Sequence, residues 1–200
     1  MSNKPFSKRS FYTDRFRSYF APVAKNSPEY HIFRLEGLFQ GLHDLWIAGA
    51  HKRRDSTEVL SAYRRVQAIT GLGSQGDVPP DSWFIMPFLM LGSMICNDAI
   101  KALQTCHDAG GPGRRNPSSV ENYVVQMRSL LITLHDFLEM HAYQNNHPQD
   151  HQTVRQELAA LLGRRASMNH NELIRVSFVT GSEIATTALA TLQHARQTAV

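Results

Sequence analysis

The chain has 200 residues, of which 42% are hydrophobic and 19% charged, and its formal net charge is +4. This is a globular composition, so it excludes a disordered chain, and the length is enough for one sizeable core. The longest uncharged apolar run, Trp83–Cys96, has 14 residues, fewer than the roughly 20 that a membrane-spanning helix needs. The first residues lack the apolar centre of a signal peptide. We therefore expect a cytoplasmic protein.

The positive charge is concentrated at the start of the chain. Residues 1–25 contain six Lys or Arg and one Asp, a net charge of +5, whereas the other 175 residues contain 15 bases and 16 acids, a net charge of −1. Aromatic residues alternate with these cations: Phe6, Phe11, Tyr12, Phe16, Tyr19 and Phe20. Cations neutralise phosphates and rings stack on bases. Residues 1–25 are thus predicted to be a nucleic-acid-binding arm whose phosphate contacts come from Lys8, Arg9, Arg15 and Arg17. The alternative is a solvated tail whose aromatic rings dock on the core.

Residues 26–200 read as one helical domain. Ser27-Pro28-Glu29 has the cap residue, the first-turn proline and the acid that are typical of a helix start, and apolar residues then recur at helical spacing to about Gly49 or Ala50. Asp55 and Glu58 form a capping pattern for a second helix, which is predicted to end near Gly71.

Three further helices are expected between residues 81 and 162. Asp81 caps a long apolar helix, in which Pro87 marks either a kink or the true first turn. Ser118 and Glu121 form a capping box for the next helix, and a shorter helix spans about 150–162. The two cysteines, Cys96 and Cys106, lie on the long helix about 15 Å apart along its axis, so we expect reduced thiols.

The segment 172–197 is predicted to be a strand followed by a helix. Ile174, Val176 and Phe178 alternate with Arg175 and Ser177, which is the period of a strand, and Gly181-Ser182-Glu183 would then cap the last helix. Two such strands can pair into a ribbon that reads the major groove of DNA, in which case Arg175 and Ser177 would contact base edges. The alternatives are an edge strand or simply the beginning of the last helix.

Three short stretches resemble the AcaB-like transcriptional activator family of conjugative plasmids and integrative elements. They are Leu42-His-Asp-Leu-Trp46, then Pro79-Pro-Asp-Ser-Trp-Phe84 before a long helix, and Val176-Ser-Phe178 before a helix rich in small residues. The resemblance covers less than a third of the chain. It implies a dimeric, DNA-binding regulator with elements like those of ribbon-helix-helix proteins.

The sequence predicts no cofactor, no metal site and no catalytic residues. The glycines of Gly71-Leu-Gly73-Ser-Gln-Gly76 match a dinucleotide-binding fingerprint, but a predicted helix precedes them where that fold needs a strand. Two pairs, His135 with Glu139 and Glu36 with His43, would need facing helices to bring them together, and the chain has no Glu-x-x-His pair of the kind that carboxylate-bridged iron sites use. His147 and His151 straddle Pro148, so a shared helical face is not assumed. The usual motifs of nucleophilic catalysis are absent.

The expected fold is therefore a mainly α, single-domain bundle of five or six helices with a minor β-strand near the C-terminus. The expected function is that of a homodimeric DNA-binding transcriptional regulator without enzymatic activity. Two alternatives remain open: a helical adaptor or nucleoprotein subunit that binds protein or the nucleic-acid backbone, and a helical enzyme with a closed pocket. The run Trp83–Cys96 helps to separate them, because burial would make it core and exposure would mark a partner surface.

Overall fold

The computed structural model describes residues 24–51, 56–72, 85–108, 117–142, 145–164 and 167–197, and within these ranges every regular element is a helix. The helices are α2 (Pro28–His51), α3 (Thr57–Thr70), α4 (Met86–Asp108), α5 (Pro117–Ala142), α6 (Pro148–Leu161) and α7 (His170–Gln197). The chain is thus a helical bundle, as expected, but the predicted minor β-strand is wrong. None of the described helices is long and apolar enough to span a membrane.

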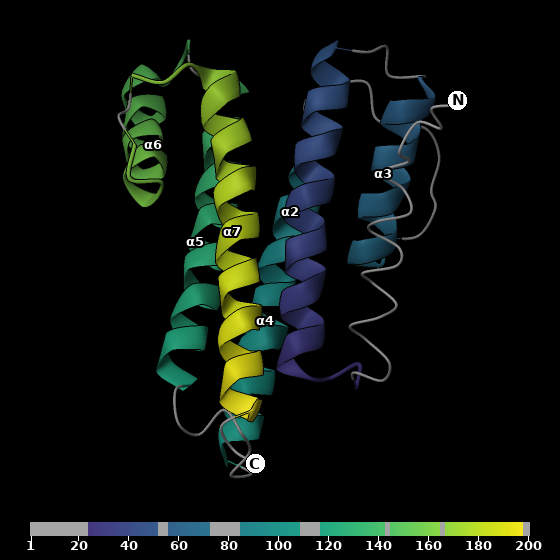
Figure 1. Ribbon diagram of the computed structural model, residues 1–200. Helices are drawn as coiled ribbons and strands as arrows, with labels where there is room; N and C mark the ends of the chain where they lie inside the picture. Colours follow the sequence, from purple (N-terminus) through teal and green to yellow (C-terminus); the bar gives the residue numbers. More distant parts are fainter. Residues whose placement is uncertain are drawn as a thin grey trace, which may run out of the picture.

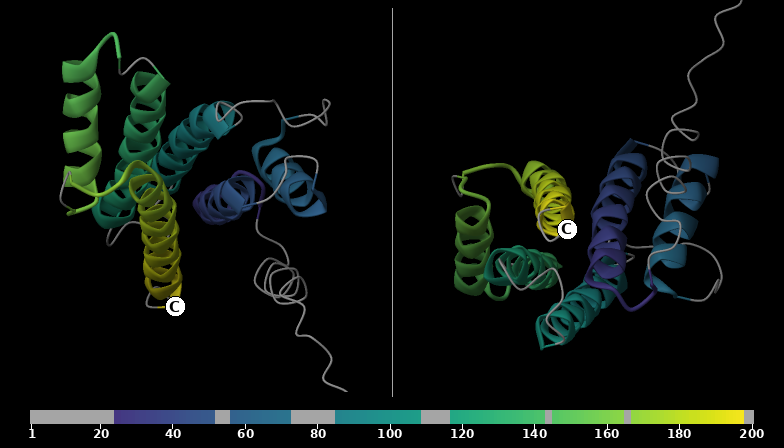
Figure 2. Two further views of the ribbon diagram at one scale, coloured as in Figure 1. Left: turned by 90° about the horizontal axis from the view of Figure 1, so that it is seen from above. Right: turned by 60° about the horizontal axis from the view of Figure 1, so that its bottom comes forward.

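Four helices, α2, α4, α5 and α7, form the centre of the bundle (Figure 1). The other two flank it: α3 packs on the outer side of α2, and α6 packs on the outer side of α5. Figure 2, seen from above, places α3 and α6 on opposite sides of the central four. Helices α2 and α7 run antiparallel, because residues near the start of α2 contact residues near the end of α7.

The first two helices begin and end close to where their capping residues predict. Ser27 precedes α2, and its side chain accepts a hydrogen bond from the backbone N–H of Tyr30 at 3.3 Å. Helix α3 is capped by Ser56 instead of the predicted Asp55, and the Ser56 hydroxyl accepts from Val59 N. Gly71 ends α3 in the left-handed conformation, with φ of 78°, which glycine adopts without steric cost.

Prolines mark the starts of the next three helices. Pro87 is the second residue of α4, so it belongs to the first turn and does not kink the helix. Helices α5 and α6 begin at Pro117 and Pro148, each ahead of the predicted starts at residues 118 and 150. Proline suits this position because the first N–H groups of a helix have no partner within it.

The segment predicted as a strand is part of α7, which runs unbroken through Gly181. Its buried residues recur at helical spacing: Leu173, Ile174, Ser177, Phe178, Gly181, Ala185, Ala188 and Leu192. The alternation of Ile174, Val176 and Phe178 was therefore misread, because two of these three side chains lie on the buried face of a helix. The predicted cap at 181–183 is wrong for the same reason.

The core joins all six helices, and its largest fully buried side chains include Phe39, Phe88, Phe137 and Phe178. Most of the apolar run ending at Cys96 is part of this core, as far as the structure describes it, from residue 85 onward. Met90 and Met94 are exposed, with exposed fractions of 49% and 58%, and Pro87 in the first turn of α4 is exposed as well. The run is therefore mainly core, with two methionines on its outer face.

Candidate functional site

The two residues predicted to read DNA bases have different surroundings on α7. Arg175 is exposed, whereas Ser177 is fully buried and its hydroxyl donates a hydrogen bond to the carbonyl of Leu173 at 2.8 Å. A buried hydroxyl that already bonds its own helix cannot reach a base edge. The β-ribbon reading of DNA by Arg175 and Ser177 is therefore wrong.

The predicted phosphate contacts Lys8, Arg9, Arg15 and Arg17 lie outside the described residues. The description begins at Ala24, which leads directly into the first turn of α2. In Figure 1, this end of α2 lies beside the last turns of α7. An ion pair joins the two helices there, with Arg196 Nη2 at 2.7 Å from Glu29 Oε1. The predicted arm is thus attached to the end of the bundle at which this ion pair joins α2 to α7.

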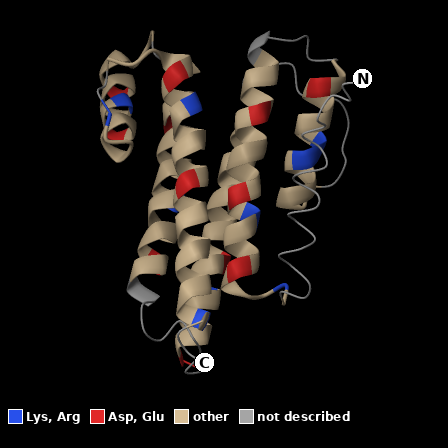
Figure 3. Cartoon of the chain, viewed as in Figure 1, with Lys and Arg blue, Asp and Glu red and all other residues tan. Residues whose placement is uncertain are grey.

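Charges on the described helices are mixed in sign (Figure 3). From residue 26 onward, the described ranges contain nine Lys or Arg and 13 Asp or Glu, a net charge of −4 (9 − 13). Some of these charges neutralise each other, as in the 2.8 Å contact between Arg65 Nη1 and Asp44 Oδ2. The helical body therefore carries the opposite net sign to residues 1–25.

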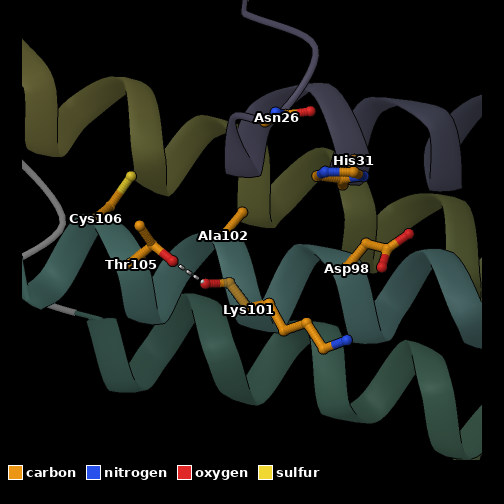
Figure 4. Close-up of a pocket in the computed structure, with 7 residues that line it drawn as sticks. All are labelled: Asn26, His31, Asp98, Lys101, Ala102, Thr105 and Cys106. Atoms are coloured by element: carbon orange, nitrogen blue, oxygen red, sulfur yellow. Dashed lines mark hydrogen bonds between the residues drawn. The ribbon is translucent and has the colours of Figure 1, made fainter.

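An open groove with a volume of about 520 Å³ lies between the start of α2 and α4. Its lining residues are Asn26, His31, Asp98, Lys101, Ala102, Thr105 and Cys106 (Figure 4). Burial lowers the pKa of His31, and Arg34 lowers it further, while Asp98 acts in the opposite direction. Nδ1 of His31 is shielded from solvent and has no hydrogen-bond partner among the described residues.

The polar groups of this groove do not form a catalytic arrangement. Cys106 lies at the opposite end of the groove from His31 and Asp98 (Figure 4), and the one hydrogen bond drawn there is the helical bond from Thr105 Oγ1 to Lys101 O. A nucleophile and its base need to lie within hydrogen-bond reach of each other. The groove therefore gives no specific support to the enzyme alternative.

A second cluster, His135, Asp136 and Glu139, lies on one face of α5, with its possible ligand atoms within 4.8 Å of one another. His135 Nδ1 is 3.3 Å from Asp136 Oδ1, and the Asp136 side chain is half exposed. The other pair considered from the sequence, Glu36 with His43, does not add to this cluster. Glu36 instead accepts a hydrogen bond from Thr186 on α7. Three ligands on one partly exposed helix fall short of the four that a closed zinc site uses.

Sequence reasoning missed a third cluster, formed by His141, His151 and His170 from α5, α6 and α7. The rings of His141 and His170 are stacked with centroids 3.7 Å apart, and the His151 ring lies 5.4 Å from that of His141. All three rings surround the buried ring of Phe137, at centroid distances of 6.4, 5.5 and 4.9 Å for His141, His151 and His170. We call these three residues the histidine cluster.

Each residue of the histidine cluster has one ring nitrogen that is shielded from solvent and has no hydrogen-bond partner among the described residues: Nδ1 of His141, Nε2 of His151 and Nδ1 of His170. Their geometry nevertheless differs from that of a metal centre, because imidazoles that ligate one tetrahedral ion radiate from it and do not stack face to face. The sequence left open whether His147 and His151 share a helical face. His147 occupies the N-cap position of α6, and the backbone N–H of His151 donates a hydrogen bond to the His147 carbonyl at 3.1 Å. The two histidines are therefore one helical turn apart.

Comparison with known proteins gave no match of any kind: no family model, no curated protein and no solved structure matches the chain.

Proposed function

We propose that this protein binds nucleic acid through the phosphate backbone, using residues 1–25 as the binding arm and the helical bundle as a non-enzymatic platform. The observation that supports this most strongly is the separation of charge. The arm has a net charge of +5, whereas residues 26–200 have a net charge of −1. A polyanion is attracted to the first, whereas the second, being nearly neutral, adds no net attraction.

The arm has the chemistry that such binding requires. Lys8, Arg9, Arg15 and Arg17 would each neutralise a phosphate and release a counterion. The six aromatic residues between and beside them can stack on unpaired bases, which is tolerant of sequence because every base has a π-face. Binding of this kind positions a protein on nucleic acid without reading its sequence.

Regulation of transcription is the more specific form of this proposal. It agrees with the resemblance to AcaB-like activators, and it would include a homodimer acting on DNA in the cytoplasm. With the ribbon excluded, base reading would need other side chains, and Arg175 on the exposed face of α7 is one cation that could approach DNA. Preference for particular duplexes would distinguish a regulator from a nucleoprotein subunit.

The test is a binding titration of the full chain and of a variant lacking residues 2–20, with fluorescent duplex and single-stranded DNA at several salt concentrations. We expect salt-sensitive binding by the full chain and a much weaker, less salt-sensitive response from the deletion. Equal binding by the two proteins, or no binding by the full chain at low salt, would contradict the proposal. Circular dichroism of the deletion variant controls for loss of the helical fold.

A protein-binding adaptor is the second candidate, and Met90 and Met94 favour it. They lie one turn apart on α4, and both are about half exposed. Methionine side chains adapt to varied partner surfaces. If the full chain binds no nucleic acid, exchanging both methionines for glutamine and comparing the proteins captured by the two forms tests this alternative.

A further inference from the structure

Helix α6 is the least embedded part of the bundle. Its only fully buried side chains are Leu158 and Ala159, and it packs mainly on α5. Val154 is partly buried and packs against the core as well, and two polar residues add further inward contacts. His151 stacks on Phe137 with an interplanar angle of 21°, and the Arg155 guanidinium donates a hydrogen bond to the carbonyl of Met168, just before α7. These two polar side chains therefore supplement a small apolar contact in holding α6 in place.

We propose that the histidine cluster makes the docking of α6 sensitive to pH, so that acidification releases α6 from α5 and α7. The geometry carries this inference. Three imidazole rings from three helices meet around one phenylalanine, and each has a shielded nitrogen that no hydrogen-bond partner in the described part of the chain stabilises.

Among the described residues, the charged groups that act on the pKa values of the cluster are Arg155 and the histidines themselves. Burial is the main cause that lowers the pKa of all three histidines, and the positive charge of Arg155 on α6 lowers each pKa further. For His170 the two effects, together with the neighbouring histidines, lower the pKa to about 4. All three rings are therefore neutral at pH 7, and protonation of one disfavours protonation of the next.

Carboxylates near the cluster in sequence are directed to other partners. On α6, Asp150 lies 3.6 Å from His147 Nδ1. On α7, the Glu172 carboxylate accepts a hydrogen bond from Asn169 Nδ2 at 3.5 Å. On α5, Glu139 groups with His135 and Asp136. The positive charge added by protonation thus faces Arg155 without a compensating carboxylate from these three helices.

The sign of the effect follows from the lowered pKa values. With α6 released, the histidines return toward their ordinary pKa of 6.5, so the released form binds more protons in acid. Docking is unaffected well above pH 6.5 and weakens as the pH falls below it, and the contribution of His170 is lost progressively until about pH 4. At pH 5.5, His170 alone shifts the docking equilibrium about tenfold toward release.

Hydrogen–deuterium exchange of the full chain at pH 7.5 and 5.5, corrected for the intrinsic rate, tests the proposal. We expect the amides of α6 to lose at least about tenfold protection at pH 5.5, while those of α2 and α4 keep theirs. Unchanged protection of α6, or an equal loss in all helices, would overturn the proposal.

Two further measurements test whether His170 causes the acid response. His170→Gln should make the acid-induced loss about tenfold smaller, whereas His107→Gln, at an exposed histidine on α4, should not change it. If His170→Gln fails to fold, NMR titration of the histidine rings in the unaltered chain decides the matter. A His170 that titrates near pH 6.5 or above, or a His170→Gln protein with the full acid response, would overturn the proposal.

Discussion

Phe39 on α2 lies against the backbone of Gly181 on α7, so closely that a Cβ at Gly181 would be 2.3 Å from Cε1 of the ring. Two more ring carbons would lie within 2.5 Å of it. Phe39 is fully buried, so its ring has little room to move aside. The missing side chain of Gly181 is therefore what allows α2 and α7 to approach each other at this level.

Gly181→Ala should destabilise the bundle. Overpacking a buried site costs about 1–3 kcal/mol, which exceeds the gain of at most about 1 kcal/mol from alanine's better helix propensity. Chemical denaturation monitored by circular dichroism measures the change. In a Phe39→Leu background the cost of Gly181→Ala should be smaller, because the branched aliphatic side chain leaves more room.

Gly37→Ala on α2 is the matched control. There the new Cβ would meet only the end of the Ile69 side chain, at 3.3 Å. Since Ile69 is only partly buried and can yield, we expect little change or a slight gain in stability. A loss at Gly37 equal to that at Gly181 would contradict the account of the close approach.

The ion pair between Glu29 and Arg196 should contribute more than an ordinary surface pair. The Glu29 side chain is only 9% exposed, and its Oε2 has no partner among the described residues. Arg196→Ala should therefore cost about 1–3 kcal/mol, because it leaves a buried carboxylate unpaired. The half-exposed pair of Arg65 and Asp44 provides the comparison, and Arg65→Ala should cost less than about 1 kcal/mol. Equal costs in urea unfolding would contradict this ranking.

The two cysteines should differ in reactivity. Burial raises the pKa of Cys96 to about 12, although Arg128 acts to lower it, so this thiol stays protonated at neutral pH. Cys106 is only partly buried, at the edge of the groove. Brief alkylation of the native chain by iodoacetamide at pH 8, mapped by mass spectrometry, should label Cys106 and spare Cys96. Labelling of both at the same rate would show that Cys96 is accessible.

The sequence predicted helix positions well where capping residues were distinct. Ser27 and Gly71 mark helix ends as expected, and the predicted starts near residues 118 and 150 lie within two residues of the observed ones. The failure in α7 has a physical cause. The buried face of this helix includes Ser177, Gly181 and alanines, so a search for large apolar residues found only the local alternation around Val176. Packing against α2 and α5 overrode the strand preference of that segment.

The histidine cluster could not be predicted in the same way. His141, His151 and His170 belong to three helices, and no spacing along the chain shows that these helices meet around Phe137. The one available signal was the density of histidines between residues 135 and 170. That density does not show which histidines meet or whether they bind metal or stack, so identifying the cluster required the three-dimensional structure.

The central claim is that residues 1–25 bind nucleic acid through its phosphates. The most direct test is the salt dependence of DNA binding by a fourfold variant, Lys8→Gln/Arg9→Gln/Arg15→Gln/Arg17→Gln. If these four cations neutralise phosphates, the slope of log affinity against log salt concentration should become shallower by about 3–4. Arg175→Ala, which removes one exposed cation from the bundle, should change the slope by no more than about 1. An unchanged slope for the fourfold variant, at a helical content equal to that of the unaltered chain, would contradict nucleic-acid binding by the arm.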